Sequence, residues 1–313
     1  MKTILIVLDS VGIGAAPDAA DYGDADSATL QHIGAAVGGL ELPTLRKLGL
    51  GNIRRDSPIP GCPAVDAPIA SHGMMRPASI GKDTITGHWE ICGLEINPAF
   101  HAFPMARPSF PADLLAAFEQ ETGRAVIGDK AASGTAIIEE LGPEQARTGA
   151  WIAYTSADSV MQLAAHTAVI PLEELYRGCE IARRLCDPLK VGRVIARPFI
   201  GPPGAYERTE DRRDYAFAPE EPLITERLRD AGIPVYAVGK IEDIVAHRGV
   251  TESVHSGNTA ESSKVVEDFM RRDGAGFIFA NFIDFDMLYG HRRDPIGYAA
   301  ALRETDEWLG RFL

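Results

Sequence analysis

Apolar runs and amphipathic stretches alternate along much of the chain. Residues 4–8 form a continuous apolar run rich in β-branched side chains, which predicts a strand buried on both faces, as in a parallel sheet. Further buried strands are predicted over 234–238 and 276–282. The spacing of apolar positions predicts helices over 28–37, 43–48, 222–231, 259–271 and 295–312. Alternating strands and helices predict an α/β fold with a mostly parallel sheet flanked by helices.

The middle of the chain is set apart by prolines and glycines at both of its ends. Four prolines between 98 and 111 mark the start of this segment, and the Pro/Gly-rich stretch 197–204 lies near its end. Helices are predicted over 112–122 and 172–185, and strands over 151–155 and 192–196. We therefore predict an inserted domain over residues 98–218, between two parts of a core domain at 1–97 and 219–313.

The charge balance limits the partners of the protein. Lys and Arg number 31 and Asp and Glu 44, so the net charge is −13. Such a surface repels nucleic acid and anionic membranes, and we expect neither as a partner. It also repels phosphate esters at long range, so any phosphate site must reverse the sign of the charge locally.

Nothing in the sequence indicates an oxidising compartment or a membrane. The four cysteines form no CxxC pair, so free thiols are expected. The apolar run near the N-terminus is too short for a signal peptide, and no stretch approaches the length of a membrane span. A soluble cytoplasmic protein is expected.

Two common phosphate-binding motifs are missing. Gly12 and Gly14 could begin a dinucleotide-binding GxGxxG motif, but Pro17 stands where its third glycine belongs. The chain also has no Walker A lysine motif. Any phosphate chemistry must therefore use other residues.

Three groups of residues could carry such chemistry. Asp9 directly follows the first predicted strand, where open α/β sheets bind ligands, although a turn residue is equally compatible. Thr84 stands where a helix running towards Cys92 is expected to begin, after a short strand predicted near 71–76. Its hydroxyl suits either an N-cap or a nucleophile held at the positive end of a helix. Asp286 and His291 follow the strand predicted over 276–282 and are plausible ligands of a divalent ion such as Mn²⁺, or members of a polar loop.

Taken together, the chain resembles the phosphopentomutases of the alkaline phosphatase superfamily. The matching motifs occur in family order, at residues 8–14 (LDSVGIG), 81–90 (GKDTITGHWE), 154–160 (YTSADSV), 239–241 (GKI) and 284–294 (DFDMLYGHRRD). The second and the last are highly specific. The resemblance implies an alkaline-phosphatase-like core whose inserted α/β domain acts as a cap.

The resemblance also implies a reaction, the interconversion of ribose 1-phosphate with ribose 5-phosphate and of their deoxy forms. In the family a phosphorylated threonine gives its phosphate to the substrate, and the resulting pentose bisphosphate returns its other phosphate. Two divalent metal ions, usually Mn²⁺, bridge the site, and a sugar bisphosphate primes the enzyme. The expected partners are small-molecule sugar phosphates.

The family roles carry over to matching residues. The nucleophile corresponds to Thr84, with Thr86 as the weaker candidate. One metal ion would take Asp286 and His291, and the other Asp9 and the Thr84 oxygen. The residues expected to bind substrate are Ser156 and Asp158 for the sugar, Lys240 for the phosphate, and Arg193 and Arg208 for the distal phosphate.

The family carries further metal ligands that have no counterpart here, namely an Asp-His pair and a later histidine. No Asp-His-Gly sequence occurs in the chain. We therefore expect the C-terminal end to be missing, and the 313 residues alone to bind metal poorly and to lack mutase activity.

Other functions remain open from the sequence. One alternative is another metal-dependent phosphomutase or a phosphatase of the same superfamily. Phosphoglycerate mutases of the metal-dependent type usually carry Ser-Glu-Val-Gly-His where this chain has residues 84–88, and a hydrolase needs water to reach the phosphothreonine. The alternative of a different class is a non-catalytic, truncated sugar-phosphate binder.

Overall fold

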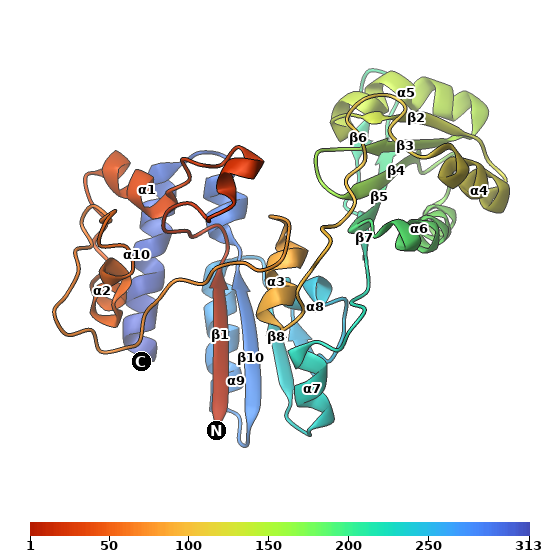
Figure 1. Ribbon diagram of the computed structural model, residues 1–313. Helices are drawn as coiled ribbons and strands as arrows, with labels where there is room; N and C mark the ends of the chain where they lie inside the picture. Colours follow the sequence, from red (N-terminus) through yellow and green to blue (C-terminus); the bar gives the residue numbers. More distant parts are fainter. The chain divides into compact units, whose positions relative to one another are not determined.

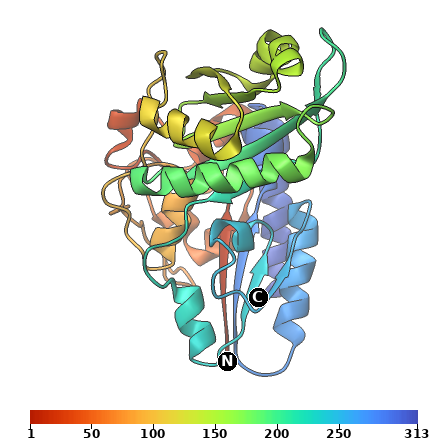
Figure 2. The ribbon, with the colours of Figure 1, turned by 90° about the vertical axis from the view of Figure 1, so that its right-hand side faces the viewer.

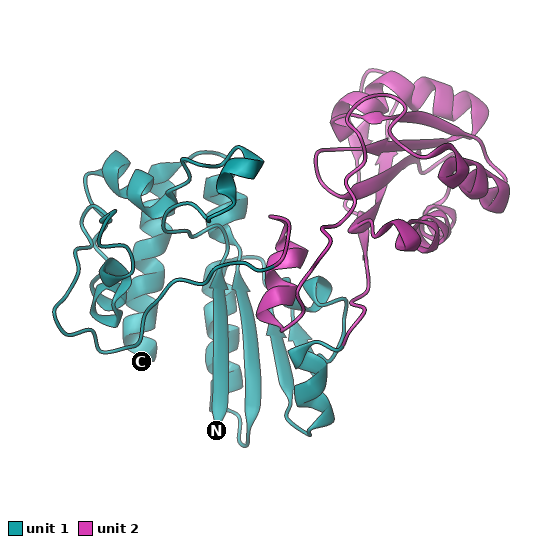
Figure 3. Cartoon of the chain, viewed as in Figure 1, with its two compact units in different colours: residues 1–78, 222–313 teal, residues 79–221 magenta.

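The computed structural model describes all residues from 1 to 313, and the chain divides into two compact units. Unit 1 consists of residues 1–78 and 222–313, and unit 2 of residues 79–221 (Figure 3). The domain boundaries predicted at 97/98 and 218/219 stay a prediction, because a division by compactness does not show which segments move together.

Unit 1 is built around a sheet of four parallel strands in the order β1-β10-β8-β9 (Figure 1). The strands are β1 (Lys2–Leu8), β8 (Val235–Val238), β9 (Glu252–Val254) and β10 (Gly276–Phe282). The α-helices are α1 (Thr29–Val37), α2 (Pro43–Leu48), α7 (Ile224–Asp230), α8 (Ile241–Ile244), α9 (Thr259–Arg271) and α10 (Pro295–Phe312). Two 3₁₀-helices, η1 (Ala19–Tyr22) and η2 (Leu50–Asn52), and the π-helix η4 (Phe285–Gly290) complete the unit. The parallel sheet flanked by helices confirms the predicted fold class.

Helices cover both faces of this sheet, as the turned view shows (Figure 2). On one face α1, α9 and α10 pack against the strands, and Val266 of α9 and Ile278 of β10 belong to one fully buried cluster. On the other face α7 and α8 lie against β8. The packed core therefore fixes the positions of the strand ends and of the loops that follow them.

The position of β1 in the sheet corrects one prediction. The sequence predicts a strand buried on both faces at residues 4–8, yet these side chains are all half-buried. The reason is that β1 pairs only with β10 and forms the edge of the sheet. β10 lies between two strands and is buried at all seven positions, as predicted. The short strand predicted near 71–76 is absent, because these exposed residues have no partner strand.

Unit 2 contains a mixed sheet in the order β2-β3-β4-β5-β6, with β7 also paired to β5. Its strands are β2 (Val126–Ala131), β3 (Trp151–Thr155), β4 (Val160–His166), β5 (Arg193–Ile200), β6 (Glu207–Arg208) and β7 (Arg213–Ala216). Its helices are α3 (Thr84–Ile91), α4 (Ala112–Thr122), α5 (Gly134–Thr148), α6 (Leu172–Cys186) and the 3₁₀-helix η3 (Asp187–Leu189).

The two faces of the unit 2 sheet carry separate cores. α4 and α6 cover one face, where Trp151 and Met161 are buried with Cys179. α5 covers the other face, where Tyr154 and Phe199 are buried. In the ribbon, α5 lies on one side of this sheet and the pair α4 and α6 on the other (Figure 1). Because side chains alternate along a strand, those of β3, β4 and β5 contribute to one cluster or the other.

The cysteines confirm one expectation from the sequence. All four thiols are free, as predicted, and the structure shows that all four are also buried. None of the helices combines the length and the apolar character that crossing a membrane would require.

Candidate active site

Two adjacent parallel strands bring the acidic residues of unit 1 to one edge of its sheet. Leu8 at the end of β1 is in register with Phe282 at the end of β10. The Asp9 amide donates a hydrogen bond of 3.0 Å to the Phe282 carbonyl, which continues the pairing by one residue. Asp9 therefore stands beside the segment that leaves β10, where parallel sheets bind their ligands.

That segment is the π-helix η4, and its geometry pairs Asp286 with His291. The His291 amide donates to the Asp286 carbonyl at 3.0 Å, a bond that spans five residues as in a π-helix. The two side chains lie on the same side, with His291 Nε2 at 3.2 Å from Asp286 Oδ2. The side chain of His291 is 75% exposed and that of Asp286 37%, so both can reach a ligand.

A pocket of about 660 Å³ adjoins this pair. Its lining includes Ser10 from the loop after β1, Asp286 and His291 from the η4 region, and Tyr298 from α10. The hydroxyls of Ser10 and Tyr298 lie 3.1 Å apart. The pKa of Tyr298 is raised to about 12, chiefly by burial and in smaller part by the carboxylates of Asp286 and Asp9. Because Asp286 and Asp9 both raise the pKa of this hydroxyl, their carboxylates concentrate negative charge at this edge of the sheet.

The residues at this edge fit part of a metal site. Carboxylate and imidazole donors suit Mn²⁺ and similar divalent ions, and the close pair Asp286 and His291 offers one of each. No three His, Cys, Asp or Glu side chains anywhere in the chain converge closely enough to hold an ion by themselves. Asp284 serves another purpose, because its Oδ2 accepts the Thr259 amide at 2.9 Å and ties this segment to α9.

Lys240 also follows a strand of the unit 1 sheet. It comes two residues after β8, and Val238 at the end of β8 is in register with Ala280 of β10. The side chain of Lys240 is exposed. The three strand ends thus present Asp9, Lys240 and the η4 residues from the same edge of the sheet.

The two threonines of α3, in unit 2, differ in exposure and in bonding. Asp83 is the N-cap, and its carboxylate accepts the Thr86 amide at 3.0 Å and the Thr86 hydroxyl at 2.7 Å. Thr86 is only 2% exposed. Thr84 is the first residue of the helix, it is exposed, and no hydrogen bond engages its hydroxyl. Only Thr84 therefore offers a free hydroxyl at the positive end of this helix.

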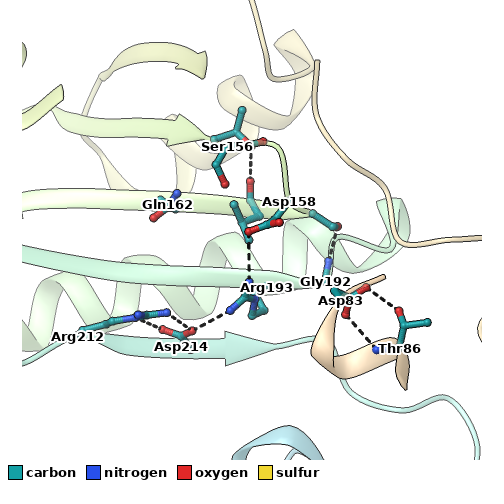
Figure 4. A network of polar contacts seen from close by, with 12 residues as sticks. Asp83, Thr86, Ser156, Asp158, Gln162, Gly192, Arg193, Arg212 and Asp214 are labelled. Carbon is teal, nitrogen blue, oxygen red and sulfur yellow. Dashed lines mark hydrogen bonds and ion pairs between the residues drawn. The ribbon is translucent and has the colours of Figure 1, made fainter. Parts of the chain in front are cut away.

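The cap residues predicted from the sequence also lie in unit 2, around the ends of β3 and β5. Arg193, at the start of β5, lies 3.8 Å from Asp158 and 3.5 Å from Asp214 (Figure 4). Ser156 directly follows β3, and Figure 4 shows it near the turn that carries Asp158. Arg208 lies on the short strand β6, next to Phe199 of β5. Unit 2 therefore brings Ser156, Asp158, Arg193 and Arg208 to one sheet.

Several residues of this region were missed from the sequence. Asp83 was missed because both Asp83 and the next residue, Thr84, are of types that commonly cap helices, so the sequence alone does not show which of the two is the N-cap. Arg197, whose Nε donates to Gln162 Oε1 at 3.0 Å, and Asp214 were missed because neither belongs to a recognisable motif. One signal was available, since Arg193 and Arg197 are four residues apart in a strand and so share a face.

Comparisons with known proteins find similarity over the whole chain. The family model described as the Metalloenzyme superfamily matches residues 1–313. A phosphopentomutase of Anaeromyxobacter dehalogenans strain 2CP-C is 50% identical over 313 residues, which is 100% of this chain and 78% of that protein. A phosphopentomutase of Anaeromyxobacter sp. strain K is likewise 50% identical over 313 residues and is covered to 79%.

Proposed function

The chain belongs to the phosphopentomutases of the metalloenzyme superfamily, and from that premise we propose that it interconverts (deoxy)ribose 1-phosphate and (deoxy)ribose 5-phosphate. The reaction runs through a phosphothreonine at Thr84 and a pentose bisphosphate. The phosphoryl group on Thr84 passes to the free hydroxyl of the sugar phosphate. The bisphosphate then turns round and returns its other phosphate to Thr84, and a sugar bisphosphate primes the protein.

The contrast between the two threonines of α3 carries this proposal. A nucleophile needs an oxygen that can reach phosphorus, and the Thr84 hydroxyl is exposed and without a hydrogen bond. The Thr86 hydroxyl is buried and donates to Asp83 at 2.7 Å, so it is already engaged. The open amides in the first turn of α3 favour a phosphorylated side chain at its first residue.

Residues of unit 1 would hold the metal ions. Asp286 and His291 would contribute to one ion, and Asp9 with the Thr84 oxygen to the other. When bound, two divalent ions, of which Mn²⁺ is the one we expect, offset the charge of the phosphate and lower the pKa of the attacking hydroxyl. The grouping of Asp9 and Asp286 beside Tyr298 supports this assignment, because two carboxylates close together repel each other and a bound cation relieves that repulsion.

Residues of unit 2 would hold the sugar. Ser156 and Asp158 offer a hydroxyl and a carboxylate to the ribose hydroxyls, and the guanidinium group of Arg193 lies 3.8 Å from the Asp158 carboxylate. Lys240 is the proposed cation for one phosphate group, and Arg193 and Arg208 are the proposed cations for the distal phosphate. A cap that excludes water keeps the phosphothreonine from hydrolysis, which is what separates a mutase from a phosphatase.

A product assay tests the proposed function. The protein expressed from its native gene is incubated with ribose 5-phosphate, Mn²⁺ and catalytic ribose 1,5-bisphosphate, and the phosphorus NMR spectrum is followed. We expect the ribose 1-phosphate signal to grow without inorganic phosphate. Growth of inorganic phosphate alone would identify a phosphatase instead. Binding of the sugar phosphate with no turnover at any metal concentration would identify a non-catalytic binder.

A further inference from the structure

Helix α3 exposes only two of its eight residues, and these are Thr84 and Gly87. Four of the others are buried and two are half-buried. Residues three apart in a helix lie on the same side, one turn from each other, so Thr84 and Gly87 are neighbours on the surface. The exposed side of the helix that carries the proposed nucleophile therefore consists of one hydroxyl-bearing residue and one residue without a side chain.

The backbone gives no reason for a glycine at position 87. The Gly87 amide donates to the Asp83 carbonyl at 3.2 Å, so the residue takes part in the regular hydrogen bonding of the helix and does not end it. Its φ angle is not positive, so any residue could adopt this conformation. Glycine is also less favourable than alanine inside a helix, because it loses more backbone freedom on folding.

Packing within the chain gives no reason either. For every other glycine in an α-helix, an added Cβ would come within 3.0 Å of another atom, so each of them makes room for a neighbour. On α6, for example, a Cβ on Gly178 would stand 2.8 Å from the Trp151 ring. A Cβ on Gly87 would meet nothing within 4 Å. Gly87 is thus the one glycine of the α-helices that no contact within the chain explains; the others are Gly34, Gly134, Gly142, Gly178, Gly297 and Gly310.

A side chain at position 87 would lean towards Thr84. In an α-helix the Cα–Cβ bond tilts towards the N-terminus, so a side chain covers the turn that precedes its own residue. The turn that precedes Gly87 begins with Thr84, the first residue of α3. Because position 87 has no side chain, the surface next to the Thr84 hydroxyl stays open.

We propose that Gly87 keeps this surface clear, so that the sugar phosphate lies directly against the backbone of α3 while phosphate is exchanged with Thr84. Gly87 is then a specificity-determining residue, because it admits an acceptor as large as a pentose phosphate to a hydroxyl on one side of a helix. No bond forms or breaks at Gly87, which acts only through its lack of a side chain. The inference rests on the proposed function and adds to it a surface that the bound sugar phosphate covers.

Two substitutions of graded size test the proposal on the protein expressed from its native gene. Calorimetric titration with ribose 5-phosphate in the presence of Mn²⁺ should show affinity reduced about tenfold in Gly87→Ala and more in Gly87→Val, because each side chain occupies space that the ligand needs. The value of kcat/KM for ribose 1-phosphate formation should fall in the same order. Normal binding and turnover by Gly87→Val would overturn the proposal.

Thermal unfolding without ligand separates this role from a structural one. Alanine and valine both favour a helix more than glycine does, so Gly87→Ala should unfold about 2 °C above the unmodified protein and Gly87→Val no lower than it. The control is Gly178→Ala, which should unfold at a lower temperature because its Cβ meets the Trp151 ring, and should bind ribose 5-phosphate normally. If either Gly87 variant unfolded at a lower temperature, the surface would serve packing within the protein and the proposal would be overturned.

The two proposals can fail separately. If the unmodified protein binds ribose 5-phosphate without forming ribose 1-phosphate, and the Gly87 variants lose that binding, the mutase proposal fails and the role of Gly87 stands. If the unmodified protein turns over and Gly87→Val turns over equally well, the mutase proposal stands and the role of Gly87 is wrong. If the unmodified protein neither binds nor converts ribose 5-phosphate, both fail.

Discussion

The two threonines of α3 should respond in opposite ways to loss of their hydroxyls. Thr86→Val removes a buried hydrogen bond of 2.7 Å to the Asp83 carboxylate. A bond to a charged group contributes about 1.5–3 kcal/mol, and Asp83 is only half-buried, so we expect about 1.5 kcal/mol less stability. Thr84→Ala removes an exposed hydroxyl without a partner, and its stability should change by no more than about 0.5 kcal/mol.

Activity should follow the reverse order. Loss of a covalent nucleophile typically lowers kcat by about 10⁴-fold or more, and we expect this of Thr84→Ala. Thr86→Val should keep kcat within about tenfold, because it disturbs only the cap of the helix. Urea unfolding gives the stability and the ribose 1-phosphate assay gives kcat for the same preparations. An active Thr84→Ala protein, or an inactive Thr86→Val protein that is still folded, would refute the reasoning.

Three further changes test other parts of the molecule. His291→Ala should weaken Mn²⁺ binding by at least about tenfold. The control His247→Ala removes another exposed histidine beside acidic residues and should leave Mn²⁺ binding unchanged; equal losses in the two variants would contradict the assignment of His291 as a metal ligand. Asp158→Ala should weaken ribose 5-phosphate binding about tenfold and leave Mn²⁺ affinity unchanged; lost metal binding would show that the cap is wrongly assigned. Asp306→Ala should lower the free energy of unfolding by about 2–3 kcal/mol, because this buried carboxylate accepts hydrogen bonds from two backbone amides at the start of α2. Urea unfolding measures the loss, and an unchanged urea midpoint would contradict that role.

The elements of unit 1 could be predicted well because their local signals agree with their tertiary setting. Helices α9 and α10 and strand β10 begin and end where the apolar pattern predicts. The burial of β1 could not be predicted in the same way. Its composition matches that of a central strand, but burial depends on how many neighbours a strand has, and this is a property of the sheet.

Unit 2 was harder to predict because some of its elements have weak local signals. Helix α5 was missed, since Gly134, Gly142 and Pro143 all lower its intrinsic helix propensity. Strands β2 and β4 were missed as well, and β2 contains a register shift near Gly128.

The candidate site could likewise be predicted only in part from the sequence. The motifs singled out Thr84, Asp286 and His291, and the structure adds the 3.2 Å pairing of the last two and the free hydroxyl of the first. The choice between Thr84 and Thr86 needs burial and bonding, which spacing alone does not supply. The bonding of Arg193 to two carboxylates likewise depends on strand pairing across β5 and β7.

Phosphopeptide mapping tests the central claim, that Thr84 carries the phosphate between the two positions of the pentose. The protein is incubated with radiolabelled ribose 1,5-bisphosphate and Mn²⁺, digested and mapped, and a second sample is first chased with unlabelled ribose 5-phosphate. We predict that the label lies on Thr84 and leaves it during the chase as sugar bisphosphate. Label on Thr86 or a histidine, or label that leaves only as inorganic phosphate, would contradict the account.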